Sequence, residues 1–181
     1  MRRPPRSRAP RASPARDRAP AGTLRAAERR DLPTLVDHRR RMFREIGRWS
    51  SAVLLRSAAE YRRWARREWA AKRFFGFVVE DSRGRIVGSG VLWLQPSQPR
   101  PSPLTRLAMP YVMSMYTEPG VRGRGVASSL VRAMIAWATA HGYRRIFLHA
   151  SKRGRPVYER LGFAAGNEMR LDLPVRAARR R

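Results

Sequence analysis

The sequence predicts a mixed α/β fold, with a central, mostly antiparallel sheet of about six strands flanked by about four helices. Three observations lead to this prediction. Apolar residues recur at three- and four-residue steps in several segments, which is the period of an amphipathic helix. Shorter runs rich in β-branched and aromatic residues lie between clusters of Gly, Pro, Asp and Ser. The two kinds of segment are interleaved along 181 residues, a length that suits one domain.

The first half of the chain is predicted to hold two helices and a β-hairpin. In order, the elements are a strand at Thr23–Ala27, a helix from Asp31 to about Arg48, a helix at Ser57–Lys72, and strands at Phe74–Glu80 and Arg85–Gln95. Asp31 is a suitable N-cap for the first helix, and Pro33 fits its first turn. Asp81–Gly84 has the composition of a hairpin turn between the two longer strands.

The second half alternates strands with helices. The predicted elements are a loop at Pro96–Pro103, a strand at Pro110–Thr117, a helix at Gly125–Ala140, a buried strand at Arg145–His149, a short helix at Pro156–Leu161, and a segment Phe163–Leu173 that ends in a strand. Gly142 is the expected residue after the C-cap of the long helix, where a left-handed backbone favours glycine.

Both ends of the chain differ from the middle. Residues 1–22 are rich in Arg and Pro and nearly free of large apolar groups, so we expect a disordered tail. The prolines forbid the amphipathic helix of a transit peptide, and there is no apolar core of a secretion signal. Residues 176–181 form a second basic tail. The folded domain is therefore expected at 23–175.

Composition excludes several classes of site. There is no cysteine, so disulfides, thiolate metal sites and a cysteine nucleophile are ruled out. The three histidines, His38, His141 and His149, form no His-x-x-x-His pair, and no metal site is predicted. No run approaches the ~18 apolar residues of a membrane span. With no signal segment either, the cytoplasm is the expected location.

The formal net charge is +27, and all but two of the 40 basic residues are arginine. Such a one-sided ratio indicates a composition bias, so we give the charge little weight as evidence of function. Physically, the surface will still attract anions, including a weak attraction for nucleic acid. The sequence leaves the oligomeric state open, a homodimer included.

The most informative run extends from Met115 to Ser128. A strand ends at Thr117, the turn Arg122–Gly125 carries two glycines, and a helix follows. Free N–H groups and the positive end of the dipole make a helix N-terminus suitable for phosphate, and glycine lets the backbone approach the anion closely. A pyrophosphate ligand is predicted, although a plain strand-to-helix turn would have the same glycines. The Lys-Ser/Thr pair of an ATP-binding loop is missing.

Two motifs together resemble the GNAT superfamily of N-acetyltransferases. The first is Arg122-x-x-Gly125-x-Ala127, preceded by Pro119, and the second is Val157–Phe163, which is similar to the Tyr-Glu-x-x-Gly-Phe motif of that superfamily. The order of the two motifs and the spacing between them also agree with that superfamily. The resemblance covers about residues 23–175. The stretch from His149 to Tyr158 resembles a stand-alone bacterial subgroup with no known acceptor.

The resemblance implies a direct transfer from acetyl-CoA to an amine, without an enzyme nucleophile. Tyr158 would be the general acid that protonates the leaving thiolate. Backbone groups of the splayed strand would hold the pantetheine arm, and N–H groups of the turn and helix start would hold the pyrophosphate. The implied cofactor-binding residues are Met115, Tyr116, Thr117, Arg122, Gly123, Arg124, Gly125, Val126, Ala127 and Ser128. Many relatives have Asn where this chain has Ser151, and a hydroxyl could replace that amide.

The general base is left open by the sequence. Glu118, at the end of the motif strand, is the first candidate, acting directly or through water. The alternative is that Glu118 is a solvated turn residue paired with an arginine. Glu168 and His149 are the other candidates for the base, although His149 on an apolar strand is expected to be a buried structural residue.

The acceptor wall is implied to come from the first two helices and the 96–109 loop. Five aromatic residues could line it or belong to the core: Trp49, Tyr61, Trp64, Trp69 and Trp93. The helical spacing of Tyr61, Trp64 and Trp69 favours the core, and Arg39–Arg41 is expected to be a solvated face. The predicted function is an acetyl-CoA-dependent N-acetyltransferase with an unidentified amine acceptor. The alternative is a catalytically inactive basic protein on the same scaffold that binds RNA or the ribosome.

Overall fold

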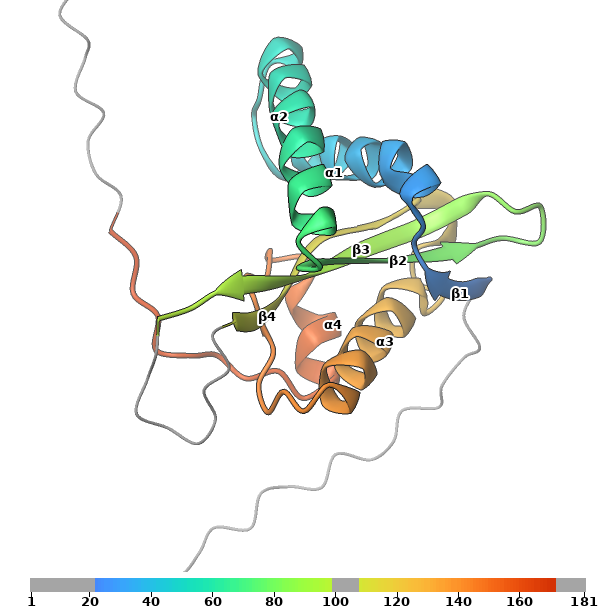
Figure 1. The fold of residues 1–181 in the computed structure, drawn as a ribbon. Helices are drawn as coiled ribbons and strands as arrows, with labels where there is room; N and C mark the ends of the chain where they lie inside the picture. The colour runs from blue at the N-terminus through green and yellow to red at the C-terminus, as the bar shows by residue number, and fades with distance from the viewer. Residues whose placement is uncertain (1–21, 99–107, 172–181) are drawn as a thin grey trace, which may run out of the picture.

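The structure is a computed structural model that describes residues 22–98 and 108–171 (Figure 1). One five-stranded sheet has the order β1-β2-β3-β4-β5, antiparallel throughout except for the parallel pair β4–β5. The strands are β1 (Thr23–Ala26), β2 (Phe74–Glu80), β3 (Ile86–Pro96), β4 (Ala108–Thr117) and β5 (Phe147–Leu148). The helices are α1 (Leu32–Ile46), α2 (Ser51–Ala70), α3 (Val126–Ala140) and α4 (Arg155–Arg160), with single 3₁₀ turns at Arg29–Asp31 and Pro119–Val121.

The sheet lies between two helical layers. Helices α1 and α2 cover one face, and α3 and α4 lie on the other (Figure 1). Because side chains alternate along a strand, each central strand supplies both cores. Val78 of β2 packs with Leu35 and Ala65 on the α1–α2 side, whereas Val79 packs with Leu130 on the α3 side. The predicted mixed α/β class is confirmed.

A bulge in β4 bends the strand next to the α1–α2 layer. Met113 pairs with Val91 and Tyr116 with Ser89, so Ser114 and Met115 together oppose Gly90. Ser114 has a φ of 54°, a left-handed backbone that is uncommon for a residue with a side chain. A Cβ on Gly90 would lie 2.3 Å from the Met115 sulfur, so Met115 fills the space that the glycine leaves. The extra residue locally increases the twist of the strand.

Strands β4 and β5 pair over only two residues, Tyr111 with Phe147 and Val112 with Leu148. From Met113 onward, β4 has no neighbour on that edge among the described residues. The end of β4 that carries Met115, Tyr116 and Thr117 therefore has an open edge. The sequence-based expectation of a splayed strand agrees with this pairing.

The helix boundaries in the first half differ from the prediction. Helix α1 ends at Ile46 instead of Arg48, and α2 begins at Ser51, six residues before the expected Ser57. The early start follows from an N-cap: the Ser50 hydroxyl accepts a hydrogen bond from the Val53 N–H at 3.3 Å. Apolar residues in the first turns of α2 are exposed. The spacing of apolar residues alone therefore did not indicate that these turns are helical.

The other boundary predictions are mostly confirmed. Gly84 closes the β2–β3 turn with a φ of 73°, and Gly142 follows α3 with a φ of 74°. Asp31 is the N-cap residue of α1, but its side chain makes no capping bond to α1. The Asp31 carboxylate instead accepts hydrogen bonds from the Arg25 guanidinium and the Glu28 N–H, which ties α1 to β1.

The strand count is lower than expected at the C-terminal end. Residues 164–171 form no regular element, so the sixth strand predicted within Phe163–Leu173 is absent up to Leu171. The predicted buried strand Arg145–His149 is also wrong in extent, since only Phe147–Leu148 pair and Phe147 is 38% exposed. Because β5 pairs over only two residues, the sheet is too small there to cover the side chains of Arg145–His149. The predicted tails and most of the 96–103 loop lie outside the described residues.

Candidate functional site

The loop before α3 places a set of backbone N–H groups at the open end of β4. Gly123 and Gly125 have φ values of 76° and 81°, left-handed conformations that glycine adopts without steric cost. The first helical bond is Ser129 N–H to the Gly125 carbonyl, at 2.9 Å. Within the described part of the chain, the N–H groups of residues 123–128 have no hydrogen-bond acceptor. Unpaired donors at a helix N-terminus are suited to binding an anion.

The position of this helix end depends on Gly88. A Cβ built on Gly88 would lie 2.3 Å from Cγ1 of Val126, the first residue of α3. Val126 itself is fully buried. The missing side chain at Gly88 lets α3 begin directly against β3, close to the end of β4.

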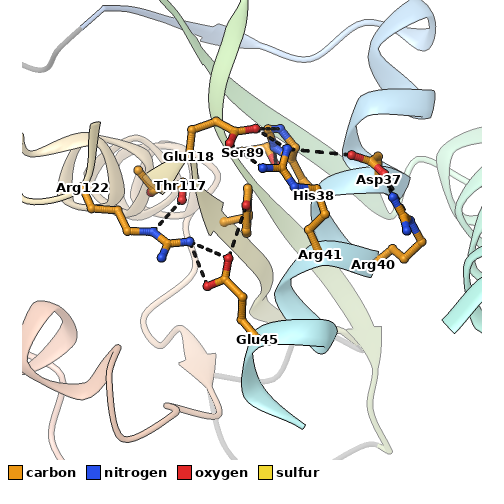
Figure 2. Close-up of polar contacts among 10 residues, drawn as sticks. Asp37, His38, Arg40, Arg41, Glu45, Ser89, Thr117, Glu118 and Arg122 are labelled. Carbon is orange, nitrogen blue, oxygen red and sulfur yellow. Dashed lines mark hydrogen bonds and ion pairs between the residues drawn. The ribbon is translucent and has the colours of Figure 1, made fainter. Parts of the chain in front are cut away.

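Arg122 holds the loop to both β4 and α1. Its Nε donates to the Thr117 carbonyl at 2.9 Å, and its Nη2 donates to both carboxylate oxygens of Glu45 at 2.7 and 2.8 Å (Figure 2). Glu45 also accepts a hydrogen bond from the Tyr116 hydroxyl at 3.4 Å. The Arg122 charge is thus already paired with a carboxylate. Arg124 is exposed and has no ion-pair partner among the described residues.

Glu118 is held by two residues of α1 (Figure 2). Both guanidinium Nη atoms of Arg41 donate to its carboxylate, the Nη2–Oε2 pair at 2.6 Å. His38 lies on the same helix face, with its Nε2 3.5 Å from Glu118 Oε1 and its Nδ1 2.9 Å from the Ser89 hydroxyl. The pairing of Glu118 with an arginine was one of the two sequence-based readings. No motif in the sequence pointed to His38, Ser89 or Glu45.

Tyr158 lies on α4 and is half-buried. Burial raises the pKa of its phenol above the ordinary value of 10, and its ring packs against Phe163 at 5.8 Å between centroids. Gly154 gives the ring room, because a Cβ there would lie 3.1 Å from Tyr158 Cε2. Ser151, the position where relatives have Asn, is exposed, and its hydroxyl accepts the Gly154 N–H at 3.1 Å.

The prediction of a buried His149 is wrong. Its side chain is 73% exposed, because β5 ends one residue earlier and no strand of residues 22–98 or 108–171 covers it. His149 Nδ1 contacts the Tyr111 hydroxyl, and its Nε2 lies 3.1 Å from Glu168 Oε1. The two alternative candidates for the base are therefore neighbours of each other, whereas the partners of Glu118 lie on α1.

The expected solvated face at Arg39–Arg41 is also wrong. All three are half-buried. Arg40 pairs with Asp37, Arg41 with Glu118, and the Arg39 guanidinium lies 4.3 Å from the centroid of the Tyr61 ring. Arg39 therefore contacts α2, Arg41 contacts the residue after β4, and Arg40 pairs within α1.

The aromatic residues are divided between core and surface. Tyr61 belongs to the core on the α1–α2 side, and Trp64 and Trp69 pack against it, as their spacing predicted. Trp93 donates its Nε1–H to buried Glu68 at 2.9 Å. Trp49, between α1 and α2, is 56% exposed and remains a candidate for the acceptor side.

Within residues 22–98 and 108–171, no group of three His, Asp or Glu side chains could hold a metal ion. In the same residues, no helix is both long and apolar enough to cross a membrane.

Comparison with known proteins shows which family this chain is similar to. The model of the acetyltransferase (GNAT) family matches residues 34–163. A glucosamine 6-phosphate N-acetyltransferase of Trypanosoma brucei brucei is 34% identical over 91 residues, which are 50% of this chain and 59% of that protein. The match therefore spans less than two thirds of that curated relative.

Solved structures agree over a longer range. A GCN5-related N-acetyltransferase from Ralstonia eutropha is 28% identical with a TM-score of 0.75, covering 83% of this chain and 97% of that one. A predicted acetyltransferase from Clostridium acetobutylicum, solved with acetyl-CoA, is 27% identical with a TM-score of 0.73 and coverages of 84% and 95%. The loop before α3 and the open end of β4 lie within the matched region, and this chain belongs to the GNAT family of acetyltransferases, which use acetyl-CoA.

Proposed function

We propose that this protein is an N-acetyltransferase that passes the acetyl group of acetyl-CoA directly to a primary amine. Acetyl-CoA supplies the acetyl group as a thioester, which an unprotonated amine attacks while the thiolate of CoA leaves. The observation that carries the proposal is the row of unpaired N–H groups of residues 123–128 beside the open edge of β4. An anion and an extended amide chain can both be held there by backbone groups.

In this proposal the backbone holds the cosubstrate. The N–H groups of Gly123, Arg124, Gly125, Val126, Ala127 and Ser128 bind the diphosphate, and the exposed Arg124 adds charge. The free edge of Met115–Thr117 pairs with the pantetheine arm. The Ser151 hydroxyl, already an acceptor for Gly154, has its own O–H left to donate toward the same arm.

Tyr158 is proposed as the general acid. Because burial raises its pKa, the phenol keeps its proton across the neutral range and has one to donate. The CoA thiol has an ordinary pKa of ~8.5, so its thiolate can accept a proton from a hydrogen-bonded donor as it leaves.

Glu118 is proposed as the general base that takes the proton of the acceptor ammonium, directly or through water. Its carboxylate lies at the end of β4, 26% exposed, so a solvent path reaches it. Arg41 keeps that carboxylate in one orientation. A fixed carboxylate is a suitable acceptor for proton transfer at close range.

For the acceptor, we propose an amine that also carries an anionic group, with glucosamine 6-phosphate as the first compound to assay. The support is the curated relative's substrate name and the arginines at the mouth of the site. Arg153 is 74% exposed and touches Glu45 only at 3.8 Å, so its charge is available to a phosphate. Glucosamine, which lacks the phosphate, is the matched control compound.

The binding half of the proposal is tested with two matched glycine variants. Gly123→Ala and Gly84→Ala both place a Cβ at a left-handed residue with nothing within 4 Å. Each should therefore lose about 1 kcal/mol of stability. Only Gly123→Ala should weaken acetyl-CoA binding in calorimetry. The expected loss of affinity is about tenfold, which corresponds to one charge-assisted hydrogen bond. Equal affinities for the two variants would contradict the proposed diphosphate site.

A further inference from the structure

One buried titratable residue, His38, has no role in the reaction described so far. It lies on α1, close to Ser89 and Glu118 (Figure 2). Its side chain is buried, at 2% exposure, and its ring centroid lies 4.8 Å from that of the Tyr116 ring. Both ring nitrogens have polar partners on different strands: Nδ1 faces Ser89 on β3, and Nε2 faces Glu118 at the end of β4. Ser89 is also buried, at 1% exposure.

These partners select one tautomer of a neutral imidazole. A neutral ring has one N–H donor and one nitrogen acceptor. The Glu118 carboxylate can only accept, so Nε2 must carry the proton that faces it. Nδ1 then accepts, and the Ser89 hydroxyl donates to it. The opposite tautomer would direct a nitrogen lone pair at a carboxylate inside a buried contact.

The groups that face His38 keep it neutral and rigid. Burial lowers the pKa of the imidazole, against the attraction of Glu118 and Asp37, while the positive charge of Arg41 acts in the same direction as burial. Tyr116 packs on the ring from β4, and Ser89 closes it from β3. His38 is therefore a fixed donor at neutral pH, and it takes no part in proton transfer.

We propose that His38 is a positioning residue for catalysis: its Nε2–H, together with Arg41, fixes the Glu118 carboxylate at the end of β4. The proposal rests on the proposed role of Glu118 as the base. His38 and Arg41 are three residues apart on one helix face, so both approach the carboxylate from α1. Ser89 acts one step further back, because its hydroxyl donates to Nδ1 and keeps the ring in place.

The tautomer is tested first, in the protein without acetyl-CoA. ¹⁵N NMR of the histidine rings distinguishes Nε2–H from Nδ1–H and charged from neutral imidazole. We expect one ring in the neutral Nε2–H form that does not titrate near 6.5, and its signals should vanish in His38→Gln. Ser89→Ala should keep the Nε2–H form, because the Glu118 carboxylate still faces Nε2. A His38 ring in the Nδ1–H form, or one titrating near 6.5, would overturn the proposal.

Two substitutions then separate positioning from packing. The side-chain amide N–H of His38→Gln can occupy the place of Nε2 and still donate to Glu118. The shorter side chain of His38→Asn places its amide N–H only at the position of Nδ1, beside Ser89. We expect kcat to fall about tenfold in His38→Asn and less than threefold in His38→Gln, the difference of one hydrogen bond to a charged group.

The KM for acetyl-CoA should change little in both variants. Among the described residues, His38 contacts the proposed binding region only through the Tyr116 ring, whereas backbone groups are proposed to hold the pantetheine arm. Equal losses of kcat and equal thermal destabilisation would mean that His38 only fills space, and the proposal would be wrong. If the wild-type protein acetylates no amine, the proposed function fails instead. The NMR result on the free protein then still decides whether His38 donates to Glu118.

Discussion

The contact between Gly88 and α3 offers the most direct structural test of the diphosphate site. Gly88→Ala adds one methyl group at a position where Val126 Cγ1 would lie 2.3 Å away, Leu130 Cδ1 3.5 Å away and the Tyr116 carbonyl 3.5 Å away. Carbon atoms in contact are normally about 3.5–4.0 Å apart. The first turn of α3 must therefore move outward by roughly 1.2 Å, because Val126 is β-branched and has one favoured rotamer in a helix.

The displacement has two costs that can be worked out separately. Overpacking a dense core costs about 1–3 kcal/mol of unfolding free energy, which for a domain of this size lowers Tm by roughly 4–8 °C at the middle of that range. The N–H groups of Val126, Ala127 and Ser128 move with the helix end. If the shift costs the equivalent of one hydrogen bond to an anion, acetyl-CoA affinity falls about tenfold.

The assay is calorimetric titration with acetyl-CoA, with Tm measured on the same samples. Gly120→Ala is the matched control, because Gly120 is in the turn just before the site, has no left-handed φ, and would place its Cβ with nothing within 4 Å. The double variant Gly88→Ala/Val126→Ala removes the clashing methyl group. It should recover most of the affinity, although Val126→Ala by itself leaves a cavity that lowers stability by about 1–3 kcal/mol.

Two results would refute this reasoning. Wild-type affinity in Gly88→Ala with a lowered Tm would mean that the helix end does not bind the diphosphate. A tenfold loss that Val126→Ala does not restore would mean that the added methyl group acts elsewhere than on α3.

Three further predictions follow from single contacts. Tyr158→Phe should lower kcat by about a hundredfold while acetyl-CoA affinity in calorimetry stays unchanged. Because burial raises the pKa of Tyr158, any alkaline decline of the wild-type rate from this group should have its midpoint above pH 10, which a pH–rate series checks. Glu68→Gln should reduce the unfolding free energy at pH 7 by up to about 3 kcal/mol, because the Arg73 hydrogen bond, and then Trp93, lower the pKa of buried Glu68 from 4.5 to about 2. The difference in unfolding free energy between wild type and Glu68→Gln should be complete above pH 4.5 and disappear as the pH falls toward 2. Urea unfolding that shows the same difference at every pH would contradict this prediction. Glu45→Gln should release Arg122 from its ion pair and raise acetyl-CoA affinity about twofold at low salt, and no change in calorimetry would mean that the Arg122 charge does not reach the diphosphate.

The sequence was most informative where local chemistry decides local structure. The hairpin around Asp81–Gly84 and the left-handed Gly142 were predictable, because turn residues act over a few positions. The Gly123 and Gly125 turn was recognisable for the same reason. Helix α2 was placed six residues late, because the Ser50 cap begins a turn whose apolar side chains face solvent.

The strands at the C-terminal end show the limit of a pattern. The sequence predicts that Phe163–Leu173 ends in a strand, and no strand forms up to Leu171, the end of the described residues. A strand also needs a neighbour to pair with, and β5 supplies only two residues of sheet. The exposure of His149 has the same origin. Pairing is a property of two segments, and the pattern of one segment does not contain it.

By itself, the sequence determined the order of the elements and the presence of two motifs that resemble one family. It also placed Tyr158 in the second motif and Glu118 at the end of the strand before the first. Only the tertiary structure brought Glu45, His38 and Arg41 of α1 to the end of β4, 70 or more residues further along the chain. It also decided that Arg122 pairs with Glu45, and that Glu118 accepts from both Nη atoms of Arg41 with His38 Nε2 3.5 Å away. The physical reason is that a carboxylate accepts hydrogen bonds from whichever donors lie near it, and the packing of α1 on β4 decides which donors these are. That packing depends on the shapes of both core faces, which the pattern of one segment does not contain.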